Sequence, residues 1–342
     1  MSDQQIVEVD PFDPGQFDPW HRAYLDAELA APPGVTSPWQ LEEVRAMMQD
    51  QGTRHRLLGY AGVVDARVVA SGFLRLPLLD NTESAELMVH VVPDARRQGH
   101  GSAMLAHLEQ VAREHGRSVL QAESSWPYDA GADGTGEPGP SFATARGFAL
   151  ALGDVKRVLR LPVPEGVLED LAAEAAAHHR DYTLRSWAGP VPDELAEGWA
   201  ALTATLGTEA PTGEMHREDE AADVSVLREA EATVAAQGRT KYNTVALDRS
   251  GQVVAYTDLA TTIHEPGKAY QWGTLVRRDA RGHRLGLAVK VANLRLLQAE
   301  RPDIELLTTY NAEVNAHMVG VNERLGFVPV ARLGEFQKRL PT

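Results

Sequence analysis

The residues with the clearest chemical potential are Arg96, Arg97, Gln98, Gly99, His100 and Gly101, which follow an apolar, β-type run and precede an amphipathic helix. Glycines let the backbone approach a ligand closely. The free N–H groups at the start of a helix point at a bound anion. The pattern therefore predicts a phosphate-binding loop, although one short glycine loop alone is weakly specific.

A second copy of this loop, Arg281, Gly282, His283, Arg284, Leu285 and Gly286, lies 185 residues further on (286 − 101). In both places the loop is followed by a helix, a strand and a Gly-Phe pair. The two pairs, Gly147-Phe148 and Gly326-Phe327, are 179 residues apart (326 − 147). Chance does not produce the same series twice at nearly constant spacing, so we infer an internal duplication.

Residue periodicity predicts the elements that position the two loops. Strands are expected directly before the loops, over 83–92 and 269–276, amphipathic helices directly after them, hairpins over 55–76 and 241–263, and an alanine-rich helix over 165–178. The acidic loop 207–222 has no apolar periodicity. We therefore expect an α+β (α/β mixed) fold with two tandem domains, 1–162 and 182–342, joined by a connector helix over 163–181. Each domain is expected to have a twisted, mixed central sheet flanked by helices.

Composition sets further limits on the protein's class. The chain has 342 residues, a net charge of -15 and no cysteine. Disulfides, thiol nucleophiles and cysteine-based zinc sites are therefore excluded, and we see no other metal-ligand cluster. The acidic balance argues against nucleic acid as a partner. Because the sequence shows no signal peptide and no apolar run of membrane-spanning length, we expect a cytoplasmic protein with no membrane association.

The first loop matches the signature Gln/Arg-x-x-Gly-x-Gly/Ala, and at these residues the chain resembles the GNAT superfamily of acetyl-CoA-dependent N-acetyltransferases in tandem form. The second loop keeps Arg281 and Gly286 but has Arg284 where the middle glycine is usual. The family pattern Asn-x6-Tyr-x3-Gly-Phe is matched by Asn315 and Gly326-Phe327, with Asn322 in place of tyrosine. Double-domain members such as mycothiol synthases are similar in layout.

The resemblance implies acetyl-CoA as the cofactor. The strand before each loop should part from its neighbour, so that its backbone can pair with pantetheine and offer an N–H to the thioester carbonyl. These strand residues are Val89, His90 and Val91, and Thr274, Leu275 and Val276. Pyrophosphate would lie on the amides from Arg97 to Ser102 and from Gly282 to Leu287. Asn311 and Asn315 are either further cofactor ligands or caps of the following helix.

The catalytic groups are less clearly indicated. The family often uses a strand-borne glutamate as general base, and Glu86 lies on the corresponding strand, unless it is simply a solvated strand residue. The usual tyrosine, which would protonate the leaving thiolate, is replaced by Asn322 and, in the first copy, by Ala143. Tyr310 is a substitute candidate, unless it lies at the edge of an aromatic core, and His90, His100 and His283 are expected to be packed or outward-facing.

The function expected is transfer of acetyl from acetyl-CoA to a primary amine of a small molecule, by direct attack in a ternary complex. Because its acceptor-side helix is more complete, the second copy is the expected catalytic half. One alternative is an acyl-CoA-binding regulatory or pseudo-enzyme module, which the missing tyrosines suggest. Another is a protein or peptide N-acetyltransferase. We expect a monomer or homodimer.

Overall fold

The computed structural model describes residues 4–50 and 52–341, and the chain forms two compact units. Unit 1 contains the chain up to Asp154, the segment Gly213–His216 and the chain from Ala331 onward. Unit 2 contains Val155–Thr212 and Arg217–Val330. The predicted tandem domains, 1–162 and 182–342, follow the repeated order of elements and stay a prediction. The compact units have other borders.

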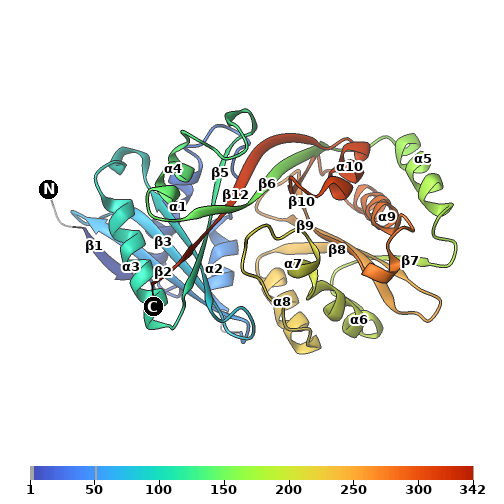
Figure 1. Ribbon diagram of the computed structural model, residues 1–342, viewed down its shortest axis with the longest axis horizontal. Helices are drawn as coiled ribbons and strands as arrows, with labels where there is room; N and C mark the ends of the chain where they lie inside the picture. Colours follow the sequence, from blue (N-terminus) through green and yellow to red (C-terminus); the bar gives the residue numbers. More distant parts are fainter. Residues whose placement is uncertain (1–3, 51, 342) are drawn as a thin grey trace. The chain divides into compact units, whose positions relative to one another are not determined.

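Unit 1 is a mixed sheet with helices on both faces (Figure 1). Its strand order is β1-β2-β3-β4-β5-β12, with β4 and β5 parallel and the other neighbours antiparallel. Its elements are β1 (Gln5–Glu8), α1 (Pro14–Glu28), α2 (Leu41–Gln49), β2 (His55–Val64), β3 (Arg67–Pro77), β4 (Ser84–Val91), η1 (Pro93–Ala95), α3 (His100–Glu114), β5 (Val119–Pro127), η2 (Tyr128–Ala130), α4 (Pro138–Thr144) and the first part of β6 (Ala149–Arg160).

Alternation along the strands gives unit 1 a core on each face of its sheet. Leu87 of β4 packs with Met104 and Leu108 of α3 on one face. On the other face, Met88 packs against a cluster with Phe17 and Trp20 of α1. Consequently the even-numbered residues of β4, including Glu86, face the side of α1 and α2.

Unit 2 repeats this plan with the strand order β6-β11-β10-β9-β8-β7. Its elements are α5 (Glu165–Ala176), β7 (Thr183–Ala188), α6 (Asp193–Thr203), α7 (Leu206–Glu209), α8 (Val224–Ala236), β8 (Arg239–Leu247), β9 (Val253–Thr262), β10 (Lys268–Val276), η3 (Arg278–Ala280), α9 (Leu285–Glu300), β11 (Leu306–Ala312), α10 (Ala316–Leu325) and the start of β12 (Val328–Arg339). The predicted α+β fold with mixed sheets flanked by helices is confirmed.

The two faces of the unit 2 sheet are also covered. Leu168 and Leu171 of α5 join the core formed by α9 and the sheet, so the predicted connector helix is a packed part of this unit. On the opposite face, Trp199 of α6 packs with Tyr256 of β9 and Leu275 of β10. This second face corresponds to the α1 and α2 side of unit 1.

The closing strands are exchanged between the repeats. Ala331–Arg339, at the end of the second repeat, pairs with Val119–Pro127 of β5 in unit 1. The last part of β6, which ends the first repeat, lies next to β11 in unit 2, where Leu161 N donates to Glu305 O (2.9 Å). Each compact unit is therefore completed by a strand from the other repeat.

A short piece of the acidic loop also belongs to unit 1. His216 N donates to Gln337 Oε1 (2.7 Å) and Gln121 Nε2 donates to His216 O (3.0 Å). Glu214 N donates to Ala151 O (2.9 Å). The carboxamides of Gln121 and Gln337 thus satisfy the backbone of this segment, which makes no regular strand.

Candidate functional site

In unit 1, β4 separates from β5 halfway along its length. The parallel pairing runs from Ser84 opposite Val119 to Leu87 opposite Ala122 and then stops, whereas both strands continue. On its other side, β4 stays paired with β3 as far as Val91. The outer backbone groups of the last four residues of β4 therefore have no strand partner on the β5 side, and Val89, His90 and Val91 lie there, as expected.

Unit 2 has the same separation between β10 and β11. Their pairing runs from Lys268 opposite Leu306 to Tyr270 opposite Thr308. Beyond this point, β10 is paired with β9 only, after a bulge between Gln271 and Thr274. Thr274, Leu275 and Val276 lie past the separation, as predicted, but the bulge was not predicted.

The first loop has the backbone of an anion cradle. Gly99 is left-handed (φ 94°) and caps α3, and a side chain placed on it would meet no atom within 4 Å. Arg97 is also left-handed (φ 64°). The start of α3 therefore presents its N–H groups on an open side of the loop.

Most side chains of the first loop hold its shape. Arg96 donates from Nε to Val91 O (3.0 Å) and from Nη2 to Ala27 O (3.1 Å). His100 Nδ1 lies 2.9 Å from Gln4 Oε1, Gln98 Nε2 donates to Asp94 O (3.2 Å), and Ser102 Oγ accepts from Arg146 Nη2 (2.5 Å). Any anion bound here would be held mainly by backbone N–H groups. Gly101, one residue into α3, lies against Val91 and Phe142.

The second loop repeats the backbone path with different surroundings. Arg281 Nε donates to Val276 O (3.2 Å), as Arg96 does to Val91 O. Arg284 takes the left-handed cap position of Gly99 (φ 54°), and Gly282 is also left-handed (φ 87°). Leu285, Gly286 and Leu287 are buried. His283 Nδ1 lies 3.2 Å from His178 O, two residues after the end of α5.

Two carboxylates contact the arginines of the second loop. Glu209 Oε2 accepts from Arg278 Nε (2.7 Å) and from Arg281 Nη2 (2.8 Å). Glu174 pairs with Arg284 and with Arg324, whose Nη1 lies 3.0 Å from Glu174 Oε1. The sequence did not indicate these contacts, because the partners are far apart along the chain.

Glu86 lies in a polar row across the unit 1 sheet. It stands opposite Arg75 of β3 and Gln121 of β5, one residue before the strands separate. Both carboxylate oxygens lie 2.9 Å from Arg75 Nη1, and the side chain is 45 % exposed. The neighbouring imidazole of His55 has its pKa lowered to about 4, chiefly by burial and then by the charge of Arg75. Glu86 is thus an accessible carboxylate held by an arginine beside the separation.

His90 lies past the separation on the same face as Glu86. Its Nε2 is 3.0 Å from Glu28 Oε1, at the end of α1, and its ring packs edge-on against Tyr24. The side chain of His90 is therefore anchored to α1, and any role in cofactor binding would fall to its backbone.

The polar candidate residues of unit 2 lie in different surroundings. Asn322 Nδ2 donates to Asn311 Oδ1 (2.5 Å), and Asn322 is completely buried with its Oδ1 unpaired in the described structure. Asn315 caps α10 by accepting from Met318 N (3.2 Å), so its cap role is the one that the structure shows. Tyr310 precedes Asn311 in β11 and so projects to the other face, where its ring lies near Lys156 Nζ (5.9 Å).

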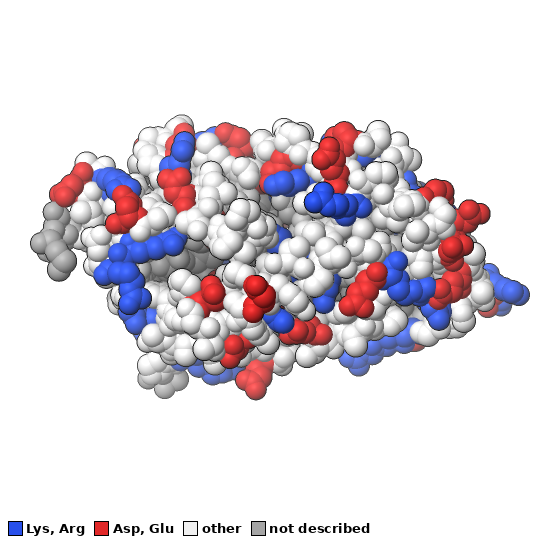
Figure 2. Space-filling view, turned by 90° about the horizontal axis from the view of Figure 1, so that it is seen from above, with Lys and Arg blue, Asp and Glu red and all other residues white. Residues whose placement is uncertain are grey.

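Acidic and basic side chains are interspersed over the face shown in Figure 2. Within residues 4–50 and 52–341, no group of three or more His, Cys, Asp or Glu side chains is arranged to hold a metal ion. No helix in the same ranges is long and apolar enough to cross a membrane.

Two comparisons with known proteins point to the same group of acetyltransferases. Residues 18–125 match the Acetyltransferase (GNAT) family. A tandem GNAT protein from the clavulanic acid biosynthesis pathway is 27 % identical in sequence, with 99 % of this chain and 100 % of that chain covered at a TM-score of 0.78. No curated protein sequence is a significant match.

More distant structures share the fold. A GCN5-related N-acetyltransferase from Sphaerobacter thermophilus is 16 % identical, covering 98 % of this chain and 95 % of that one (TM-score 0.63). Saccharomyces cerevisiae N-myristoyltransferase with bound myristoyl-CoA is 10 % identical, covering 98 % and 83 % (TM-score 0.60). These likenesses show that this chain shares the fold of both proteins. Residues 18–125 thus match a GNAT acetyltransferase domain, and the chain as a whole has the layout of a tandem GNAT protein.

Proposed function

We propose that the protein transfers the acetyl group of acetyl-CoA to a primary amine of a small molecule, by direct attack in a ternary complex. The observation that carries the proposal is the separation of β4 from β5 directly before the open loop at Gly99. A strand edge and a helix start in series suit the pantetheine arm and the pyrophosphate of one CoA molecule. A small acceptor is supported by the tandem relative, since clavulanic acid is itself a small molecule.

The chemistry requires one proton to leave and one to be supplied. The amine nitrogen attacks the thioester carbonyl, the C–S bond breaks, and CoA leaves as a thiolate that takes up a proton. We assign Glu86 as the group that accepts the proton of the attacking amine, directly or through water. Arg75 positions this carboxylate through its Nη1.

We place the transfer in unit 1, whereas the sequence favoured the second copy. In the first loop, the arginine at position 96 contacts only carbonyl oxygens among the described residues, whereas its counterpart Arg281 is paired with Glu209. The competing assignment puts the reaction in unit 2, with Tyr310 and Asn322 as the polar groups at the leaving thiolate. Asn322 favours it in one respect, because its buried unpaired oxygen lies next to Asn311.

Three matched glycine variants distinguish the two units. Gly99→Asp, Gly282→Asp and Gly116→Asp each place a carboxylate at a left-handed glycine with open space around it, in the first loop, in the second loop and at the far end of α3. A new charge about 6 Å from a phosphate costs about 2.8 kcal/mol at an effective dielectric constant of about 20, or roughly 100-fold in affinity.

The assay is release of the CoA thiol from acetyl-CoA with a panel of small amines and peptides. We expect Gly99→Asp to raise the KM for acetyl-CoA roughly 100-fold, while Gly282→Asp and Gly116→Asp leave it nearly unchanged. The reverse result for Gly99 and Gly282 would place the reaction in unit 2. CoA binding without turnover on any amine would instead indicate a non-catalytic module, and turnover on peptides alone would indicate a peptide N-acetyltransferase.

A further inference from the structure

We infer that Arg146 binds the 3′-phosphate of CoA, the phosphate that lies on the ribose and not in the diphosphate bridge. The inference rests on the proposed function for the identity of the ligand. In that function, the diphosphate lies on the amides from Arg97 to Ser102, and the pantetheine arm follows the edge of β4. The adenosine end of the molecule then leaves the loop away from the strands, where a further cation would stabilise its separate phosphate.

Arg146 lies two residues after α4 and reaches the first turn of α3. Its Nη2 donates to Ser102 Oγ (2.5 Å) and its Nη1 to Ala145 O (3.4 Å). The guanidinium lies over the ring of Phe142, 5.1 Å from the ring centroid. The same ring borders Gly101, since a Cβ placed there would lie 3.6 Å from it. A hydroxyl and an aromatic ring thus hold the guanidinium beside the amides of the loop.

The charge of Arg146 remains available to a ligand. Its acceptors are a hydroxyl and a carbonyl oxygen, and no described residue offers it a carboxylate. The side chain is exposed, and a guanidinium stays protonated in proteins. Because a guanidinium carries five N–H donors in a planar fork, most of them are left for the oxygens of a phosphate.

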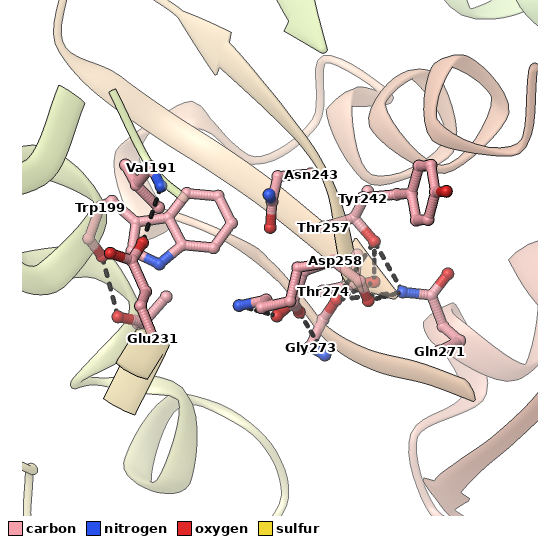
Figure 3. A network of polar contacts seen from close by, with 12 residues as sticks. Val191, Trp199, Glu231, Tyr242, Asn243, Thr257, Asp258, Gln271, Gly273 and Thr274 are labelled. Carbon is pink, nitrogen blue, oxygen red and sulfur yellow. Dashed lines mark hydrogen bonds and ion pairs between the residues drawn. The ribbon is translucent and has the colours of Figure 1, made fainter. Parts of the chain in front are cut away.

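Lys241 of unit 2 illustrates the usual arrangement, in which a carboxylate neutralises a cation. Its Nζ lies 2.6 Å from Asp258 Oδ2. The other oxygen of Asp258 accepts from Gly273 N (2.8 Å), so both oxygens of this carboxylate have donors (Figure 3). Such a pair satisfies its own charges inside the protein. Arg146 has no counterpart of Asp258 among the described residues, and an anionic ligand would supply the missing charge.

The fold does not require an arginine at this place. By the spacing of the two repeats, Ser102 corresponds to Leu287 (102 + 185) and Arg146 to Leu325 (146 + 179). Leu287 and Leu325 are buried in one apolar core of unit 2. The equivalent contact in the second copy is therefore made by apolar side chains. The polar contact of Arg146 with Ser102 belongs to the first copy alone, which is the copy that we propose to carry out the transfer.

The test compares the binding of CoA and of 3′-dephospho-CoA to the full chain by isothermal titration calorimetry. The variant is Arg146→Gln, which removes the charge and keeps a donor for Ser102 Oγ. The control is Arg113→Gln, in the last turn of α3, where the arginine lies 3.5 Å from Glu109. Gly99→Asp identifies the binding event that belongs to the first loop, because its new charge weakens that event. Circular dichroism and thermal melting verify that each variant is folded.

We expect the natural protein and the Arg113→Gln control to bind CoA at least about 10-fold more tightly than 3′-dephospho-CoA, because only CoA makes the charge-assisted contact. Arg146→Gln should bind both ligands equally, with its affinity for 3′-dephospho-CoA unchanged. The inference is overturned if this variant keeps the preference for CoA. It is also overturned if the variant weakens both ligands alike, which would place the guanidinium at the diphosphate, or if the natural protein has no preference.

The proposed function fails in a different way. If the natural chain binds neither ligand at a site that Gly99→Asp weakens, the first loop is not a CoA site, and the proposed function and the inference fail together. If the preference for CoA is present and is lost in Arg146→Gln, but no amine is acetylated, the transfer is refuted and the role of Arg146 in binding is supported.

Discussion

Lys290 links the stability of unit 2 to pH. It lies on α9 at the position that Leu105 takes in the first repeat, is 1 % exposed, and has no ion-pair partner in the described part of the chain. Its Nζ lies 5.7 Å from the ring centroid of Phe327. Burial lowers the pKa of Lys290 from 10.5 to about 7. The unfolded chain therefore binds more protons than the folded chain between these two values.

The size of the effect follows from proton linkage. Between pH 7 and about 10.5, the free energy of unfolding should rise by up to about 1.4 kcal/mol per pH unit, because the unfolded state alone keeps the proton. At pH 7 the buried lysine costs about 4 kcal/mol relative to a group with an unshifted pKa. Methionine has a similar length and no charge, so Lys290→Met should be more stable at pH 7, by an advantage that shrinks towards pH 10.

Urea unfolding between pH 6 and pH 10 measures both quantities. Leu105→Met is the control, because it makes a similar change at the equivalent position of α3 without a titrating group, and it should leave the pH dependence unchanged. The reasoning is refuted if Lys290→Met is less stable than the natural protein at pH 7. It is also refuted if the variant keeps the full rise in stability between pH 7 and pH 10.

Three further predictions concern unit 1. Glu86→Gln should lower kcat of the proposed transfer by roughly 100-fold or more, with little change in the KM for acetyl-CoA, in steady-state assays. His55 has a folded pKa of about 4, below its unfolded value of 6.5, so the protein should lose stability as pH falls through this range; His55→Gln should lose less, as thermal melting at pH 7 and pH 4.5 would show. Gln337→Ala removes the acceptor of His216 N, so hydrogen exchange at that amide should accelerate, and unchanged protection would contradict the assigned contact.

Local patterns in the sequence were sufficient to predict those structural features that depend only on residues close together along the chain. Gly99 and Arg96 lie within one turn of the helix that they start, so the first loop and the strand before it were predictable. The bulge at Gly273 was not, because it depends on Asp258 across the sheet and on the ring of Tyr256. The contacts of Glu174 and Glu209 could not be predicted for a similar reason. Glu174 lies 110 residues from Arg284, and Glu209 lies 72 residues from Arg281.

The exchange of the closing strands could not be predicted from the sequence either. The near-constant spacing of the repeats shows that each has the same elements in the same order. It does not show which sheet the last strand of each repeat joins, because that choice leaves the residue pattern along the strand unchanged. The compact units therefore have other borders than the contiguous domains that the repeat predicts.

The exchange makes the two repeats dependent on each other for folding. A fragment ending at residue 162 would lack Ala331–Arg339 and would leave β5 as an unpaired edge along its whole antiparallel register. Such an edge invites pairing with another chain and aggregation. Once the strands had been exchanged, splitting the gene between the two repeats would have left each product without one strand of its sheet. A copy that had lost its catalytic value would still be retained, because its final strand completes the sheet of the copy that works.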